Sequence, residues 1–192
     1  MHRFKTAKKE NIILYLAGPM ENCTAESAVE WRDRISPKLI EYFGNKVEII
    51  DPCKTESSKL GDLIEPGTDL KDTKKIMKGW KESGKWDKFD KAIYRIIVED
   101  LWAVQKSDLL IVYLDFEVQM GGTISELTYA LLHRVPVYAV IKDPVSKINS
   151  WILGMVRHNG KYYPNFTQLI DAVFEDYKEF KNVGTQDSNS KS

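Results

Sequence analysis

The sequence has little cysteine, no long hydrophobic run and no excess of either charge, and each absence excludes a class of protein. The two cysteines, Cys23 and Cys53, are too few for a disulfide scaffold and lack Cys-x-x-Cys spacing. The longest apolar run, Leu109 to Leu114, is far shorter than the roughly 20 residues that a membrane helix needs. The 28 Lys and Arg residues balance 28 Asp and Glu residues, so binding to a nucleic-acid polymer or to a membrane surface is not expected.

What is present is the composition of an ordinary globular domain. The 192 residues are 43% hydrophobic and 29% charged, which predicts a single domain over residues 1–183. Residues 1–10 are basic and polar with no apolar signal core after them, which favours a cytoplasmic protein. Residues 184–192 are polar and are predicted to be disordered. The histidines are isolated, so we expect neither a metal nor another cofactor.

Apolar strands alternate with amphipathic helices along most of the chain. Strands are predicted at residues 12–17, 47–50, 109–114 and 135–141, and helices at 24–43, 87–106, 123–133, 150–156 and 166–177. Strands that are apolar on both faces are typical of a parallel sheet covered by helices on each side. The sequence therefore predicts an α/β protein, a three-layer sandwich around a parallel sheet.

Residues 53–88 break this alternation. They are rich in Lys, Glu, Ser and Gly and carry few apolar residues apart from Trp80 and Trp86. We interpret them as an inserted surface segment or a mobile lid, because they hold too little apolar material for a core of their own. The two tryptophans either stack on a bound base or anchor the segment to the domain, and we favour anchoring.

The most informative loop follows the predicted strand 109–114. Ligands of parallel sheets bind outside the carboxyl ends of the strands, which selects the loops at 18–24, 51–54 and 115–126. In the last of these, Gly121 and Gly122 let a ligand approach the backbone closely, and Glu126 lies near the start of a helix. The helix dipole there favours an ionised carboxylate, which suits a nucleophile. The alternative, which spacing alone favours, is a capping box in which Glu126 only bonds an amide at the helix start.

Asp100 is the second acidic candidate. Its helix runs antiparallel to the next strand, so stepping back from Lys106 to Asp100 moves about 9 Å toward the carboxyl edge of the sheet. The alternative is that Glu99 and Asp100 both face water. Two carboxylates at the opening of one pocket indicate glycosidic chemistry, in which one attacks the anomeric carbon and the other exchanges a proton with the leaving group. Asp51 and Asp115 follow strands, where turn residues are common, and Tyr15 is equally compatible with a core position.

Three motifs in order resemble the nucleoside 2-deoxyribosyltransferase family, which includes deoxyribonucleoside 5′-monophosphate N-glycosidases. They are Leu14-Tyr15-Leu16-Ala17-Gly18-Pro19, Glu99-Asp100 with Asp108-Leu-Leu-Ile-Val, and Gly122-Thr123-x-x-Glu126-Leu-x-Tyr-Ala130. The resemblance implies a flavodoxin-like sheet and no cofactor. It implies that Glu126 attacks C1′ to form a covalent deoxyribosyl-enzyme, that Asp100 exchanges a proton with the nucleobase, and that Tyr15 orients Glu126. The candidate substrate-binding residues are Gly18, Pro19, Asp51, Asp115, Gly121, Gly122, Thr123 and Asn159.

The resemblance also implies partners. The substrates would be a nucleoside or nucleotide and a free nucleobase, and the protein would be a homo-oligomer whose pocket lies near a subunit interface. Asn159 would complete a neighbouring pocket, since it follows Ser150-Trp151 as an Asn follows a Ser-Trp pair in some members. The chain departs from the family at Met120, where some transferases carry Asp and some nucleotide hydrolases carry Ser. Asp115 or Glu117 would substitute if the loop were rearranged.

Three functions therefore stay open. The first is transfer of deoxyribose between bases, which the absence of Lys and Arg from residues 20–24 favours over a dedicated phosphate clamp. The second is hydrolysis of nucleoside 5′-monophosphates, with the phosphate bound by the amides near Gly121 or by a basic residue of the segment 53–88. The third is a non-catalytic nucleotide-binding domain, which the capping-box interpretation of Glu126 would suit.

Overall fold

The described part of the chain forms five strands in one parallel sheet. The computed structural model describes residues 10–21 and 23–182, so the predicted disordered tail at 184–192 lies outside the described residues. The strands are β1 (Ile12–Ala17), β2 (Val47–Ile50), β3 (Leu109–Leu114), β4 (Val137–Ile141) and β5 (Gly160–Tyr163). All pairs are parallel and the order is β2-β1-β3-β4-β5, which is the flavodoxin-like order. The predicted α/β sandwich with a parallel flavodoxin-like sheet is confirmed.

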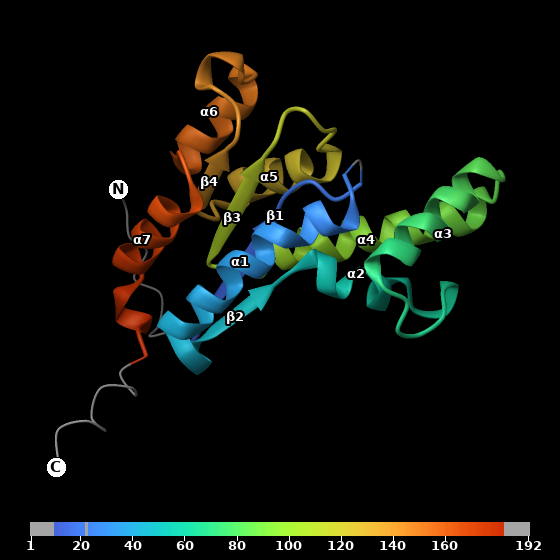
Figure 1. The fold of residues 1–192 in the computed structure, drawn as a ribbon, viewed down its shortest axis with the longest axis horizontal. Helices are drawn as coiled ribbons and strands as arrows, with labels where there is room; N and C mark the ends of the chain where they lie inside the picture. The colour runs from blue at the N-terminus through green and yellow to red at the C-terminus, as the bar shows by residue number, and fades with distance from the viewer. Residues whose placement is uncertain (1–9, 22, 183–192) are drawn as a thin grey trace, which may run out of the picture.

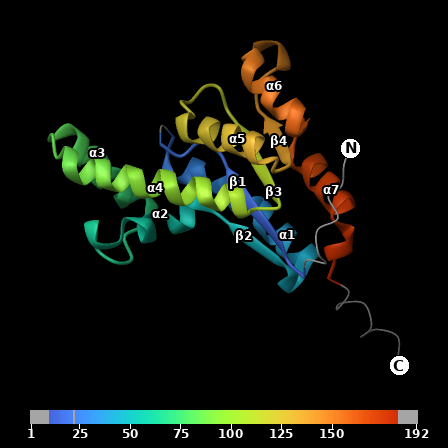
Figure 2. The same cartoon turned by 180° about the vertical axis from the view of Figure 1, so that it is seen from behind.

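Helices cover both faces of this sheet (Figures 1 and 2). One face is covered by α1 (Ala25–Phe43) and α7 (Phe166–Asp176), and the other by α4 (Trp86–Lys106), α5 (Gly121–His133) and α6 (Ser150–Asn159). Alternate residues of β1 belong to different cores: Leu14 packs with α1 and α7, whereas Tyr15 packs with α4 and α5. Burial on both faces is why the strands are continuously apolar.

Some element boundaries differ from the sequence prediction. Helix α5 begins at Gly121 rather than at residue 123, and α6 continues to Asn159. Strand β5 was not predicted, because Gly160–Tyr163 is short and half-exposed at the sheet edge and so lacks an apolar run. It lies so close to β4 that a Cβ atom on Gly160 would be 1.7 Å from the Val137 carbonyl oxygen.

The segment 53–88 is mostly helical. It contains α2 (Pro52–Leu60) and α3 (Leu70–Glu82), and α3 projects beyond the sheet together with the first part of α4 (Figures 1 and 2). Its few apolar residues converge on a small buried cluster, consisting of Leu60, Trp80, Ala92 and Ile96. Trp80 is therefore an anchor, as favoured above, whereas Trp86 is 52% exposed. No helix in the described part of the chain is long and apolar enough to span a bilayer.

Candidate active site

Tyr15, Asp100 and Glu126 come together beside the switch point between β1 and β3. Tyr15 lies on β1, Asp100 on the helix before β3, and Glu126 on the helix after it. The Tyr15 hydroxyl donates to Glu126 Oε1 at 2.6 Å. The Asp100 carboxylate is near enough to raise the pKa of Glu126 and that of Tyr15. The topology thus brings together three groups of which the first and last, Tyr15 and Glu126, are 111 positions apart in the sequence.

The Glu126 carboxylate is not used as a helix cap. Since α5 begins at Gly121, Glu126 lies in its second turn and Thr123 is an internal residue. Among the described residues its one hydrogen-bond donor is Tyr15, and no backbone amide there donates to either carboxylate oxygen. The capping-box interpretation is therefore wrong, and no donor among the described residues bonds to Oε2 of Glu126.

Burial dominates the electrostatics of Glu126. Burial, and after it the charge of Asp100, raise the pKa of the carboxyl to about 7, while the Tyr15 hydrogen bond opposes the shift. The expectation that a helix N-terminus would favour the anion is therefore not met. Tyr15 is fully buried, and burial, followed by the charges of Glu126 and Asp100, raises the pKa of its hydroxyl well above the usual value. The hydroxyl stays protonated and acts as a donor, so Tyr15 is both a core residue and a site residue.

Asp100 does not face water. Lys59 on α2 donates from Nζ to Asp100 Oδ1 at 2.6 Å, and the two side chains are only 6% and 14% exposed. The adjacent Glu99 is exposed, as the solvated-face alternative required, but Asp100 is not. A third acid lies nearby, since Glu56 Oε2 is 4.0 Å from Lys59 Nζ and burial raises the pKa of Glu56 to about 7.

Sequence reasoning missed Lys59, Glu56 and a buried arginine. Arg32 is fully buried on α1, where its guanidinium donates to the carbonyls of Leu16 and Gly18, each at 3.3 Å. It lies at helical spacing in an apolar stripe, and a charged residue at such a position is a signal that could have been recognised. Lys59 and Glu56 carry no such signal, because they lie in a segment that is polar throughout.

Two substrate-binding candidates support the scaffold of the site. Asp51 is 3% exposed, accepts the Cys53 amide at the start of α2 at 3.0 Å, and pairs with Arg32 Nε at 3.3 Å. Gly18 is required by packing, because a Cβ atom there would be 2.8 Å from Trp31 Cζ2. Pro19, next to it, is buried.

The loop after β3 has an exposed end at the start of α5 and a part whose acidic side chains bind a lysine. Gly121 and Gly122 open α5 on the surface, and a Cβ atom at either would meet no atom within 4 Å, whereas Thr123 is buried. Asp115 and Glu117 both bind Lys142 Nζ, at 3.0 and 2.5 Å. These two acids are thus engaged with a lysine, while the buried Met120 accepts the Asp115 amide on its sulfur.

Asn159 is not brought to this site. It lies immediately before β5, at the amino end of the sheet, opposite the carboxyl end where Glu126 and Asp100 lie. Its Nδ2 donates to the carbonyls of Ala130, at 3.2 Å, and Val135. Within this chain the Asn159 amide ties α6 to the end of α5, and its contact with the pocket of a neighbouring subunit stays a prediction.

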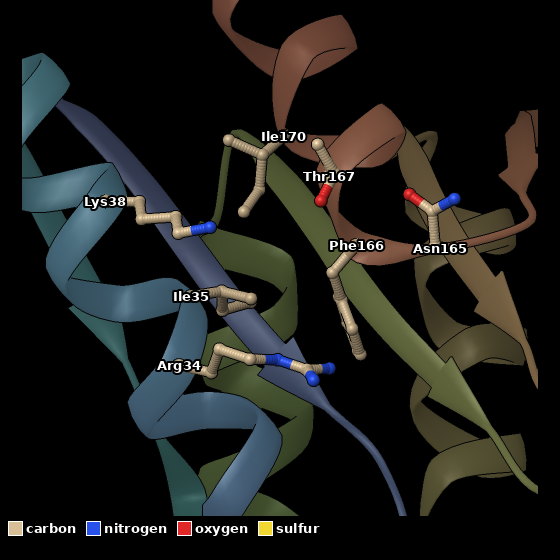
Figure 3. Close-up of a pocket in the computed structure, with 7 residues that line it drawn as sticks. All are labelled: Arg34, Ile35, Lys38, Asn165, Phe166, Thr167 and Ile170. Atoms are coloured by element: carbon tan, nitrogen blue, oxygen red, sulfur yellow. The ribbon is translucent and has the colours of Figure 1, made fainter.

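A separate cavity of about 150 Å³ lies on the other face of the sheet, between α1 and the start of α7 (Figure 3). Arg34 and Lys38 reach toward it from α1, and Asn165 and Thr167 line it from the α7 side. It is lined by none of the three grouped site residues, so it is not a part of the candidate site. Among the described residues no group of three His, Cys, Asp or Glu side chains is arranged to hold a metal.

Comparison with known proteins finds likeness in fold. No protein-family model matches the chain, and no curated protein matches it in sequence. A conserved protein from Enterococcus faecalis V583 is similar with a TM-score of 0.58 and 16% identity, over 86% of this chain and 99% of that chain. A 2-deoxyribosyltransferase from the psychrotolerant bacterium Bacillus psychrosaccharolyticus is similar with a TM-score of 0.51 and 16% identity, over 88% and 95% of the two chains. The chain shares its α/β fold with these proteins along nearly their whole length.

Proposed function

We propose that the protein cleaves the N-glycosidic bond of 2′-deoxynucleosides and transfers the deoxyribosyl group to another nucleobase. The observation that carries the proposal is the Glu126 carboxylate, bonded by Tyr15 on Oε1 alone and placed beside a second acid, Asp100. The likeness in fold to a 2-deoxyribosyltransferase and the three sequence motifs support it.

The chemistry is a double displacement. The ionised Glu126 attacks C1′, the C1′–N bond breaks with its electron pair leaving on the base, and that base takes a proton from Asp100. In the second half, a nitrogen of the incoming base attacks C1′, the bond to Glu126 breaks, and the proton of that base returns to Asp100. Tyr15 holds Glu126 in place through both halves.

Hydrolysis of nucleoside 5′-monophosphates is the second candidate. The observation that favours it is the open start of α5, where the amides of Gly121 and Gly122 form a site for an anion such as phosphate. Water would then take the place of the second base. A non-catalytic binding domain is less well supported, because Glu126 is not the helix cap which that interpretation required.

We also propose that the protein is a cytoplasmic homo-oligomer with one catalytic domain over residues 1–183, into which the segment 53–88 is inserted. Large apolar side chains are exposed on the helices of one face, namely Tyr94, Ile97 and Trp102 on α4, Leu132 on α5 and Trp151 on α6. Exposed apolar surface of this kind is typical of a contact between subunits. This face carries α4 and α5, which hold Asp100 and Glu126, so a subunit contact here would lie near the site.

Incubation with a deoxynucleoside, with and without a second free base, tests the proposal. Exchange of the base supports transfer, and release without exchange supports hydrolysis, for which the 5′-monophosphate is run in parallel. Intact mass after an acid quench should show a deoxyribosyl adduct on the wild type and none on Glu126→Gln. The matched control is Glu99→Gln, which alters an exposed acid and should keep full activity. A wild type that is silent on every substrate would overturn the proposal.

A further inference from the structure

Lys59 is a buried cation placed against the proposed acid of the site. Its ammonium donates to Asp100 Oδ1 at 2.6 Å, and its side chain is 6% exposed. We propose that Lys59 is a positioning residue for departure of the nucleobase, because it fixes the Asp100 carboxyl and stabilises the carboxylate left when the proton goes to the base. The inference rests on the proposed function and adds a residue from outside the sequence motifs.

The helix that carries Lys59 is firmly placed. At its start, Asp51 accepts the Cys53 amide and pairs with Arg32. At its end, Leu60 is fully buried in the apolar cluster that includes Trp80. Burying an ammonium is costly unless it is paired, so this placement holds Lys59 against its acidic partners. Those partners are Asp100 at 2.6 Å and Glu56 at 4.0 Å.

The Lys59 contact restrains Asp100, and Tyr15 is near the same carboxylate. The Tyr15 hydroxyl donates to Glu126 Oε1 at 2.6 Å, and after burial the charges of Glu126 and Asp100 raise its pKa, so both acids are near it. A proton donor must lie within hydrogen-bond reach of its target, and a misplacement of about 1 Å can cost about 100-fold in rate. When Asp100 gives its proton to the leaving nitrogen, it becomes an anion beside the Lys59 ammonium.

The first test is a kinetic comparison of Lys59→Met and Lys59→Arg with the wild type. Partners that orient a reacting group typically contribute about 10- to 100-fold, so Lys59→Met should lower kcat by about that factor with KM little changed. Lys59→Arg, which retains a buried cation, should recover part of the loss. The matched control is Lys78→Met in α3, because Lys78 is 74% exposed and pairs with Glu82.

The second test separates positioning of the acid from simple support of the fold. A deoxyriboside whose leaving group departs without taking a proton, such as 7-methyl-2′-deoxyguanosine or 4-nitrophenyl 2-deoxyriboside, does not need Asp100 as an acid. Lys59→Met should therefore be close to wild type on such a substrate and impaired on ordinary deoxynucleosides. Glu126→Gln should be inactive on both. Equal loss by Lys59→Met on both kinds of substrate would overturn the inference.

Failure of the inference differs from failure of the proposed function. One outcome is that the wild type is active, Glu126→Gln is inactive and Lys59→Met has wild-type activity. In that case the proposed role of Lys59 is wrong and the proposed function is still supported. If the wild type is inactive on every deoxynucleoside and nucleotide, both are wrong. Circular dichroism checks that Lys59→Met folds, and Lys59→Gln, which keeps a hydrogen-bond donor but no charge, replaces it in both tests if it does not.

Discussion

At the scale of single residues, the candidate site places acids where charge is costly. Glu126 is 8% exposed and lies beside Asp100, which pairs with Lys59 at 2.6 Å, and Lys59 is also 4.0 Å from Glu56. Arg32 and Lys59 supply the compensating positive charge. A carboxyl with a pKa of about 7 is a workable nucleophile near neutral pH, since about half of it is ionised there.

The raised pKa of Glu126 predicts the pH dependence of activity. In the proposed mechanism attack on C1′ needs the ionised carboxylate, so kcat/KM should fall as pH drops below about 7. The charged and titratable groups that act on Glu126 are Asp100, Tyr15, Arg32 and Lys59. Rates between pH 5 and 9 measure the profile, with base release followed at saturating and limiting substrate. A rate that is flat over this range would contradict an ionisation of Glu126 near pH 7.

The same group predicts how stability depends on pH. Because burial raises its pKa to about 7, folded Glu126 holds its proton over a range in which the unfolded chain has released it, and the wild type loses stability as pH rises from about 4.5 to about 7. Glu126→Gln removes this loss while keeping an oxygen that accepts from Tyr15. Urea denaturation should show the variant to be more stable at pH 8 by about 1–3 kcal/mol, and close to the wild type at pH 4.5. Glu99→Gln is the control and should follow the wild type at both pH values. A variant less stable than the wild type at pH 8 would show that the carboxylate contributes favourably to the fold.

At the scale of elements, the helices α2 and α3 complete the site from outside the central sheet. Besides the Lys59 contact, Lys74 on α3 donates to the carbonyls of Cys23, at 2.6 Å, and Met20. These carbonyls belong to the loop after β1, so α3 is bonded directly to a loop at the carboxyl edge. The segment 53–88 is thus joined to the site at two places.

The anchoring role of Trp80 predicts a local loss of structure on truncation. Trp80 is 8% exposed in a small cluster, and removing a buried tryptophan typically costs about 3–5 kcal/mol. Trp80→Ala should speed hydrogen exchange in α2 and α3, leave β1 and β3 protected, and lower activity because Lys59 is no longer held. Trp86→Ala, which truncates a 52% exposed side chain, is the matched control and should change little. Unchanged exchange in α2 after the Trp80 substitution would show that the cluster does not hold this helix.

At the scale of the whole molecule, the sheet order determines which loops meet. The order β2-β1-β3-β4-β5 places β1 next to β3, so the loops that follow these two strands meet at the carboxyl edge of the sheet. Asp100 reaches the same edge because α4 runs antiparallel to β3. The helices on the side of α4 and α5 also carry exposed apolar residues, of which Leu132 is 71% and Trp102 is 60% exposed. One face of the molecule therefore combines the candidate site with surface suited to a second subunit.

The proposed subunit contact predicts a change in mass. Light scattering should show the wild type as an oligomer, and charged residues at the exposed apolar positions, as in Trp102→Glu with Leu132→Glu, should convert it to a smaller species. The control is a pair of substitutions on the opposite face, Lys38→Glu with Lys46→Glu, which should leave the mass unchanged. A wild type that is monomeric at high concentration would contradict the proposal.

The sequence predicted most of the elements because their signals are local. Strands β1 and β3 are buried on both faces and so read as unbroken apolar runs, and α1 has an apolar residue at each helical turn with Thr24 as its cap. The edge strand β5 has no such signal, since its four residues are half-exposed or exposed and include Gly160 and Lys161. Helices α2 and α3 were missed for the same kind of reason, because their apolar residues are few and become meaningful only when they meet α4.

The candidate site, like the fold, was predicted only in part from the sequence. Glu126, Asp100 and Tyr15 were identified as candidates from their positions near strands and helix starts, which are properties of the chain itself. By its own residue pattern, the sequence determined the sandwich class and the presence of two acids near one sheet edge. The tertiary structure alone decided that Glu126 is bonded by Tyr15 rather than by an amide, that Asn159 lies at the far edge, and that Lys59 is the partner of Asp100. Such pairings join residues 41 or 111 positions apart, and they depend on how whole helices pack, which no local pattern encodes.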